Sequence, residues 1–308
     1  MVSCRRSLIG ILTFSLLLTA CRTFASPSPT PDSASEPTSL PATATPAPDY
    51  VNRLRNAEYQ LGLTDTPQLV QLTDGSFSRG EPGSIDFTSV KMTDFIARGD
   101  LNGDGVDEYA AIVAENYGGT GTFVFLALFV EAGGSLKFQT STLVDDRPLL
   151  NELSIASGEI FLDATIHGAN DPMCCPTLRT ERHYRLSHNH LRLADYVTFT
   201  PDGRPRTITI DFPANGMEVF RSVPIKGSVA IAPFENNLVY RIYDLGGVEL
   251  AVGSITVTAA DLGAPGVFDQ TILLGNILSG TVIRLEVQDV NAEDGSLFAM
   301  DSVELVVK

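Results

Sequence analysis

Short runs in which apolar and polar residues alternate make up most of the chain after about residue 62. Alternation with a period of two predicts β-strands that bury one face. In the first half of the chain the runs are VKMTDFIARGDL, TFVFLALFV, GEIFLDATI and ERHYRL. The second run is almost continuously apolar, which favours a fully buried strand. Gly, Asn and Asp stand between the runs, where turns require them.

The segment from Asp49 to about Gly62 follows a different period. Its apolar residues are spaced as on one face of a short amphipathic helix, and Gly62 is a suitable stop. The sequence therefore predicts a short helix ahead of the first strands.

A different pattern of apolar and polar residues begins after residues 198–206, where the segment TFTPDGRPR contains two prolines and a glycine. The runs that follow are TITIDFP, EVFRSVPIKGSVA, NLVYRIYD, VELAVGSITVTA, GVFDQTILLG, VIRLEVQDV and SVELVVK. Seven short strands within about 100 residues predict an immunoglobulin-like β-sandwich. We therefore expect a mostly β protein, with an α+β or β-rich N-terminal domain at 49–200 and the sandwich at 207–308.

Residues 208–308 also resemble the immunoglobulin-like domain of bacterial spore germination proteins. The resemblance rests on ITIDFPANGMEVFRSVPIKGSVAIAPFENNLVYRIYDLGGVELAVGSITV, then GAPGVFDQTI, and finally DGSLFAMDSVELVV, in that order. It implies a non-catalytic module of cell-envelope and spore-coat proteins. A fold does not by itself settle a function, so the resemblance leaves the partner of this domain open.

The first residues of the chain are typical of an export signal. Arg5 and Arg6 precede the apolar run Leu8–Leu18, which is too short to cross a bilayer comfortably. The run ends in LTAC and so resembles the lipobox of bacterial lipoproteins, which implies cleavage after residues 1–20 and lipidation of Cys21. The lipid would hold the chain on a membrane, outside the cytoplasm. An ordinary signal peptide with an incidental cysteine and a short membrane anchor are the alternatives.

Residues 21–48 form a Pro-, Ser- and Thr-rich tether that has too little apolar surface to fold and favours extended conformations. Signal cleavage would remove two of the 21 basic residues and none of the 37 acidic ones, so the net charge of −16 would become −18. Such an acidic chain is poorly suited to nucleic acid and well suited to cations.

The stretch GDLNGDGVDEYAAI places oxygen-bearing residues two positions apart in a tight turn. The candidate ligands of a metal ion are Asp100, Asn102, Asp104, the Val106 carbonyl and Glu108. Oxygen atoms at this spacing converge on one centre, and Ca²⁺ takes about 6–8 hard oxygen ligands at flexible angles.

The flanks of this stretch read as strands, and the twelfth position of an EF-hand loop would be Ala111, so the stretch is not an EF-hand. It resembles instead the calcium loops of FG-GAP repeats in integrins and related bacterial β-domains. The resemblance implies a Ca²⁺ ion with a structural role. A solvated acidic turn is the alternative, and a single copy excludes a full propeller.

Cys174 and Cys175 are adjacent and lie between two prolines. Three interpretations remain open: a vicinal disulfide, two reduced thiols, and a redox or soft-metal site with help from Met173 and His167. His188 and His190 lie in an expected hairpin turn, where a zinc site would lack a third ligand.

The sequence has no nucleophile elbow, HExxH helix, phosphate loop or dinucleotide fingerprint. We therefore predict a non-catalytic lipoprotein of the cell envelope that is stabilised by Ca²⁺ and meets a protein or cell-wall partner through its C-terminal domain. The alternative is an extracytoplasmic thiol-redox or soft-metal protein that uses Cys174 and Cys175.

Overall fold

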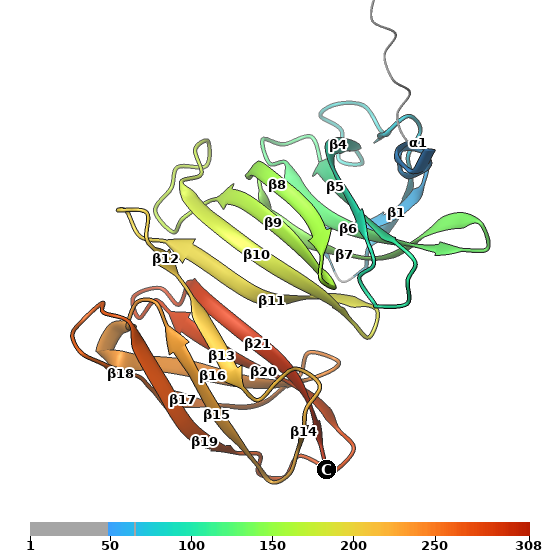
Figure 1. Ribbon diagram of the computed structural model, residues 1–308. Helices are drawn as coiled ribbons and strands as arrows, with labels where there is room; N and C mark the ends of the chain where they lie inside the picture. Colours follow the sequence, from blue (N-terminus) through green and yellow to red (C-terminus); the bar gives the residue numbers. More distant parts are fainter. Residues whose placement is uncertain (1–48, 65) are drawn as a thin grey trace, which may run out of the picture. The chain divides into compact units, whose positions relative to one another are not determined.

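Antiparallel β-strands make up most of the chain in the computed structural model, which describes residues 49–64 and 66–308 (Figure 1). The mostly β fold expected from the sequence is confirmed. The predicted signal peptide at 1–20, the tether at 21–48 and Cys21 lie outside the described residues. Among the described residues, no helix is both long enough and apolar enough to cross a membrane.

A five-stranded antiparallel sheet forms the centre of the N-terminal block, the part of the chain predicted as the N-terminal domain (residues 49–200). Its strands, in spatial order, are β3 (Ser76–Arg79), β4 (Thr88–Gly99), β5 (Glu108–Asn116), β6 (Phe123–Ala132) and β7 (Ser135–Asp146). Most side chains of β5 and β6 are buried on both faces of the sheet. This double burial explains why the apolar run of β6 is continuous instead of alternating.

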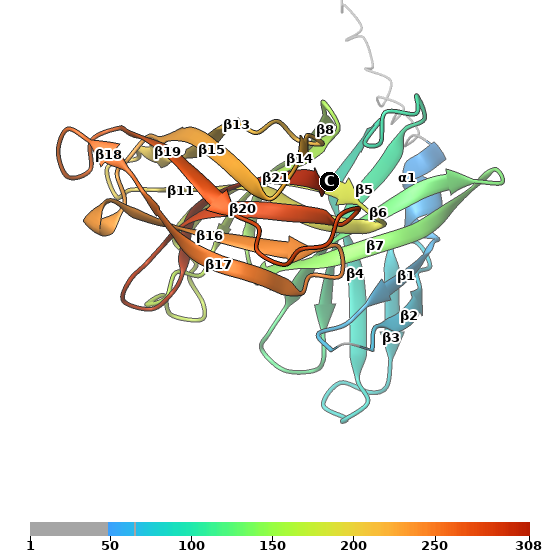
Figure 2. The ribbon, with the colours of Figure 1, turned by 90° about the horizontal axis from the view of Figure 1, so that it is seen from below.

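The two faces of this sheet pack against different layers. One face shares a core with α1 (Asp49–Arg55), β1 (Glu58–Leu61) and β2 (Gln68–Gln71), which Figure 2 shows beside the sheet. The other face shares a core with four strands of a second sheet. These are β8 (Leu149–Ala156), β9 (Glu159–Ile166), β10 (Leu178–Ser187) and β11 (His190–Phe199).

The helix predicted from Asp49 to Gly62 is correct only in its first half. Helix α1 ends at Arg55, and residues 58–61 form β1, which pairs with β2 from Glu58 opposite Gln71 to Leu61 opposite Gln68. Tyr59 and Leu61 are the buried residues of β1, and their spacing of two places both side chains on the same face of a strand. The Tyr59 hydroxyl donates a hydrogen bond to the Leu54 carbonyl (3.1 Å), which joins the end of the helix to the strand.

The second sheet continues without interruption from the N-terminal block into the C-terminal block. β11 pairs with β21 (Leu297–Val307) through three residue pairs, and beyond β21 lie β20 (Val282–Val290), β16 (Asn237–Asp244) and β17 (Glu249–Thr256). The expected domain boundary at 200–207 lies in the turn after β11. The sheet nevertheless continues from one side of this boundary to the other, because β11 pairs with β21. The described residues all belong to one compact unit, and the division into two domains stays a prediction.

The C-terminal block consists of two antiparallel sheets around one apolar core. The second layer is formed by β13 (Ile208–Phe212), β15 (Ser222–Val229), β19 (Gly266–Leu273) and β18 (Thr258–Ala259). β12 (Pro205–Arg206) pairs with β11, β14 (Glu218–Val219) pairs in parallel with β21, and a short 3-10 helix spans Phe234–Asn236. The strands overlap the predicted runs, although EVFRSVPIKGSVA and VELAVGSITVTA each contain two strands and β21 begins before SVELVVK, at Leu297. The immunoglobulin-like assignment of this sandwich stays a prediction.

Two carboxyl groups lie opposite each other where β11 meets β21. Asp195 is the direct antiparallel partner of Asp301. Burial, together with the charge of Asp301, raises the pKa of Asp195 to about 7, and burial also raises the pKa of Asp301. Asp301 is held by the backbone N–H groups of Ile210 and Ser302, each at 2.7 Å, whereas Asp195 has no such anchor among its described contacts.

We predict that this carboxyl pair makes the junction less stable as the pH rises. Because the folded-state pKa of Asp195 is raised, its protonated form is favoured by folding, and the associated stability is lost as the pH rises from about 4 through 7. Chemical unfolding should therefore show that Asp195→Asn is more stable than the parent at pH 8, by on the order of 2 kcal/mol, with a smaller difference at pH 5. The exposed Asp94→Asn is the matched control, and an identical pH dependence in both variants would contradict the prediction.

Candidate functional site

The predicted calcium stretch forms the loop between β4 and β5, as expected from its strand-like flanks. β4 ends at Gly99 and β5 begins at Glu108, and these two residues are direct partners in the ladder. The pairing of Gly99 with Glu108 therefore holds the two ends of the loop as far apart as two neighbouring strands of a sheet. The eight residues between them must reverse the chain within that distance.

Three of the predicted ligands fold the loop by accepting backbone hydrogen bonds. Asp100 accepts from the N–H groups of Gly103 (2.7 Å) and Gly105 (2.9 Å), Asn102 accepts from Asp104 (2.9 Å), and Asp104 accepts from Val106 (2.8 Å). Gly103 and Gly105 have φ values of 80° and 84°, a region that is open to glycine and strained for most other residues. The spacing of oxygens two residues apart thus builds successive Asx turns.

Glu108 closes the loop from its buried end. Its residue exposure is 3%, and its two carboxylate oxygens accept hydrogen bonds from the Leu101 N–H (2.8 Å) and the Asn102 side-chain amide (3.1 Å). Burial raises the pKa of Glu108, and the negative charges of Asp104 and Asp100 raise it further. In contrast, backbone N–H donors, chiefly that of Gly105, hold the pKa of Asp100 below its usual range.

Three carboxyl groups therefore face one small loop, and the described contacts of these groups include no basic side chain. The Arg98 guanidinium lies 3.8 Å from the carboxylate of Asp107, an acid of the loop that is outside the predicted ligand set. The donor set is chemically suited to Ca²⁺, because each carboxylate oxygen has a second lone pair beyond the one used in the loop. Even so, no group of three His, Cys, Asp or Glu residues in the described part of the chain is already arranged around a metal position.

We predict that Glu108 is required for the stability of the hairpin whether or not a metal binds. Glu108→Ala removes the only described acceptor for the Leu101 N–H, and Leu101 is 5% exposed. Leaving a buried donor unpaired costs about 1–3 kcal/mol, so chemical unfolding in the presence of a chelator should show a loss of this size. The neighbouring Asp107→Ala should change the free energy of unfolding by less than about 0.5 kcal/mol, since its pair with Arg98 is exposed. Equal losses in the two variants would refute this role.

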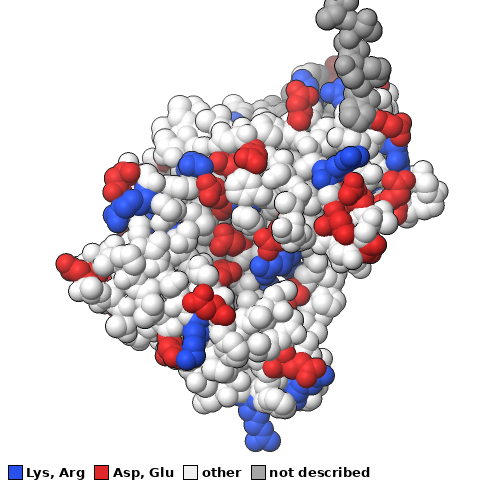
Figure 3. All heavy atoms as spheres, viewed as in Figure 1, with Lys and Arg blue, Asp and Glu red and all other residues white. Residues whose placement is uncertain are grey.

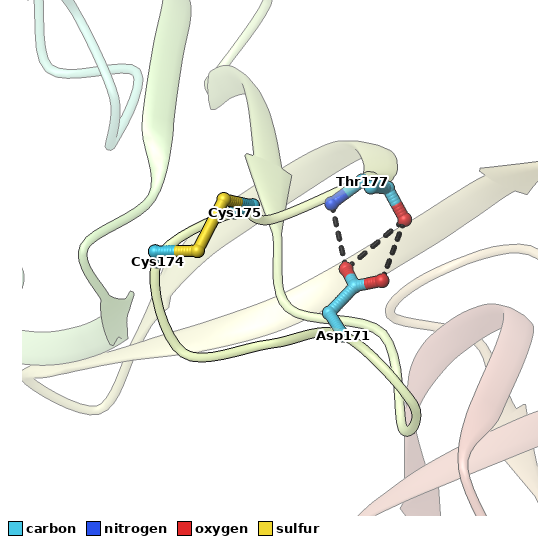
Figure 4. The surroundings of a disulfide bond; sticks show 4 residues. All are labelled: Asp171, Cys174, Cys175 and Thr177. Atoms are coloured by element: carbon cyan, nitrogen blue, oxygen red, sulfur yellow. Dashed lines mark hydrogen bonds between the residues drawn. A yellow bond between two sulfur atoms is a disulfide. The ribbon is translucent and has the colours of Figure 1, made fainter.

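The cysteine pair lies in the loop between β9 and β10, where the two sulfur atoms form a vicinal disulfide (Figure 4). Both cysteines are exposed. Asp171 closes the base of this loop: its carboxylate accepts hydrogen bonds from the Gly168 N–H (2.8 Å), the Thr177 N–H (2.7 Å) and the Thr177 hydroxyl (2.8 Å). Asp171 is not among the site residues predicted from the sequence, although an Asp before Pro with a Thr six residues later is compatible with such a closed turn.

The structure does not assemble the histidines into one site. His183 pairs with Glu159 (2.9 Å), which raises the pKa of His183, and His188 lies beside the Ser187 hydroxyl (3.1 Å) in the predicted hairpin turn. His167 lies 3.5 Å from Asp145 and has an unpartnered, buried Nε2 atom. In the described residues, no further His, Cys, Asp or Glu joins His188 and His190 to complete a zinc site.

Comparisons with protein-family models and with curated proteins give no match to this chain. The resemblances to spore germination proteins and to FG-GAP loops therefore stay predictions that rest on the quoted residues. Figure 3 shows Lys and Arg side chains interspersed with Asp and Glu, with no broad basic patch among the described residues on the face shown.

Proposed function

We propose that this chain is a non-catalytic lipoprotein of the bacterial cell envelope, in which Ca²⁺ bound at the β4–β5 loop stabilises the fold. The observation that supports this best is the convergence of Asp100, Asp104 and Glu108 on one loop, with no basic side chain among the described contacts of these three carboxyl groups. A divalent cation would relieve the mutual repulsion that contributes to the raised pKa of Glu108.

The ion would be held by the side chains of Asp100, Asn102, Asp104 and Glu108 and by the carbonyl of Val106. Residues 102–106 of the loop are exposed, and a loop of this kind outside the cell binds Ca²⁺ with a Kd on the order of 10⁻⁴–10⁻³ M. The ion would have a structural role, since the loop joins β4 and β5, two paired strands of the five-stranded sheet.

The remaining parts of the proposal come from the sequence. A lipid on Cys21 would attach the chain to the membrane, and residues 21–48 would extend the folded unit away from it. A protein or cell-wall partner would meet the C-terminal sandwich, where Phe234 in the PFENN turn is 69% exposed. Nucleic acid is a poor partner for a chain with a net charge of −16.

We predict that Ca²⁺ raises the melting temperature of the full-length chain. At about 5 mM Ca²⁺ and a Kd in the range above, binding to the native state should add about 1–2 kcal/mol, or a shift of roughly 2–8 °C. Asp104→Ala should melt at the same temperature with Ca²⁺ and with chelator, because it removes one ligand and one of the Asx turns. Differential scanning calorimetry provides the measurement.

Asp107→Ala is the matched control for this experiment, because it removes an acid from the same loop that is outside the proposed ligand set. It should retain the full Ca²⁺-dependent shift. A parent melt that is indifferent to Ca²⁺, or an equal shift in Asp104→Ala, would make the loop a solvated acidic turn and defeat the calcium proposal.

Thiol–disulfide exchange is a second candidate, favoured by the exposure of both Cys174 and Cys175 in the loop between β9 and β10. The non-catalytic proposal predicts that titration of the exported chain with a thiol reagent detects neither of these cysteines before reduction and both afterwards. Detection of one free, rapidly reacting thiol at neutral pH would instead support exchange chemistry. Cys174→Ser serves as the control, since it leaves Cys175 free without a bonding partner.

A further inference from the structure

A buried acid interrupts the apolar face of β20 at one end of the C-terminal sandwich. Ile283, Leu285 and Val287 alternate along this strand and belong to the apolar core. Asp289 continues the same alternation, so it lies on the core face of the strand, and the residue is only 5% exposed. A carboxyl group in such a place costs free energy unless other groups replace its lost water.

Asp289 has no hydrogen bond among its described contacts. Its described charge partner is Arg206 of β12, whose Nη1 atom lies 4.0 Å from the Oδ2 atom of Asp289, too far for a hydrogen bond. The Arg206 guanidinium lies over the ring of Phe298 at 4.5 Å and likewise has no described hydrogen-bond acceptor. Burial raises the pKa of Asp289, and the charge of Arg206 lowers it.

Both groups keep access to solvent beside one cavity. The side chains of Arg206 and Asp289 retain 25% and 8% exposure, and neither belongs to the described residues whose unpartnered polar atoms are fully covered. The two residues line a cavity of about 440 Å³, which is within the range of about 300–1,000 Å³ for ligand pockets. Phe234 of the PFENN turn also lines it and is 69% exposed, so its ring has free surface for a ligand.

The separation of the two charged groups determines which ligand atom fits between them. A hydroxyl oxygen can lie about 2.9 Å from Nη1 of Arg206 and about 2.7 Å from Oδ2 of Asp289 at the same time. A hydroxyl group accepts one hydrogen bond and donates another, whereas an ammonium group cannot accept from Arg206 and a carboxylate cannot donate to Asp289.

The charges at the cavity favour a neutral ligand. Arg206 and Asp289 have opposite charges that largely offset each other, so neither a cation nor an anion gains much from the pair. Glu293, the other charged residue of the described lining, is exposed, so solvent and salt screen its charge.

We propose that this cavity binds a neutral saccharide. One sugar hydroxyl bridges Asp289 and Arg206, and the C–H groups on one face of the pyranose ring pack against Phe234. The inference rests on the proposed role of the C-terminal sandwich as the partner surface, and it specifies the chemical class of that partner. No residue of the cavity belongs to the β4–β5 loop, so this proposal and the calcium proposal can fail separately.

The test is a ligand-observed NMR titration of the full-length chain with methyl β-D-glucopyranoside, once with Ca²⁺ and once with chelator. Sorbitol has the hydroxyl groups without a rigid ring, and cyclohexanol has an apolar ring with a single hydroxyl. We expect the glucoside to saturate the site and to bind at least about fivefold tighter than either comparison ligand. Absence of glucoside binding up to about 50 mM in both conditions would mean that the cavity holds water only and would overturn the inference. Equal binding of sorbitol or cyclohexanol would also overturn it.

Phe234→Ala should weaken glucoside binding about fivefold, because the apolar face that packs against the sugar is lost. Phe220→Ala is the matched control, since Phe220 is 68% exposed and lies outside the described lining of the cavity. It should change the affinity less than about twofold. Both side chains are exposed, so both variants should fold, and equal effects of the two would overturn the site.

Asp289→Asn keeps the size of the side chain but removes its charge, and it should also weaken glucoside binding about fivefold. Asp211→Asn, at an exposed acid outside the cavity, should leave the affinity unchanged. Melting curves check that each variant is folded. Unchanged affinity in a folded Asp289→Asn variant would overturn the bridging contact and the site with it.

The natural source of the sugar is a free saccharide or one unit of a cell-wall glycan. A parallel titration with cellotetraose separates the two. Binding more than about fivefold tighter than that of the glucoside exceeds the statistical gain of four rings and identifies a glycan chain. A smaller gain, or weaker binding, identifies a free saccharide, and both results support the site.

Discussion

The pairing of β11 with β21 is the interaction on which the rest of the structure depends. Three residue pairs join strands of the N-terminal and C-terminal blocks into one continuous sheet, although the two blocks differ in their pattern of strand-like runs. Side chains reinforce the seam from both sides: the Ser302 hydroxyl donates to the Ala194 carbonyl (2.9 Å) and Arg185 donates to the Ser302 carbonyl (2.9 Å). The Thr198 hydroxyl also donates to the Phe298 carbonyl at 2.7 Å.

The acidic groups of the β4–β5 loop and those of the β11–β21 seam lie in two different environments. In the β4–β5 loop, backbone N–H groups and a side-chain amide support the carboxylates, and residues 102–106 are exposed to solvent. At the seam, Asp195 and Asp301 are half-buried and face each other, so protonation is what relieves their repulsion. The same residue type thus suits cation binding in one setting and proton binding in the other, because solvent access differs.

Local pattern was sufficient to predict the strands that bury a clear face, and the acidic hairpin loop between two of them. It failed where the pattern was weak or ambiguous. β7 carries many Ser, Thr, Lys and Gln residues and is the outermost strand of its sheet, so its alternation is blurred. Residues 58–61 fit a helix or a strand, and pairing with β2 decided between them. The meeting of Asp195 with Asp301 is set by tertiary pairing over about a hundred residues, which no local pattern encodes.

If the chain is exported as proposed, the adjacency of Cys174 and Cys175 simplifies its oxidative folding. A bond between neighbours encloses no intervening residues, so it removes almost no conformational freedom from the unfolded chain. Signal cleavage would remove Cys4, and lipidation would block Cys21, which leaves each of the two remaining cysteines with a single partner beside it. Oxidation outside the cytoplasm thus has one intramolecular product, and the chain would need no isomerase to correct a wrong pairing.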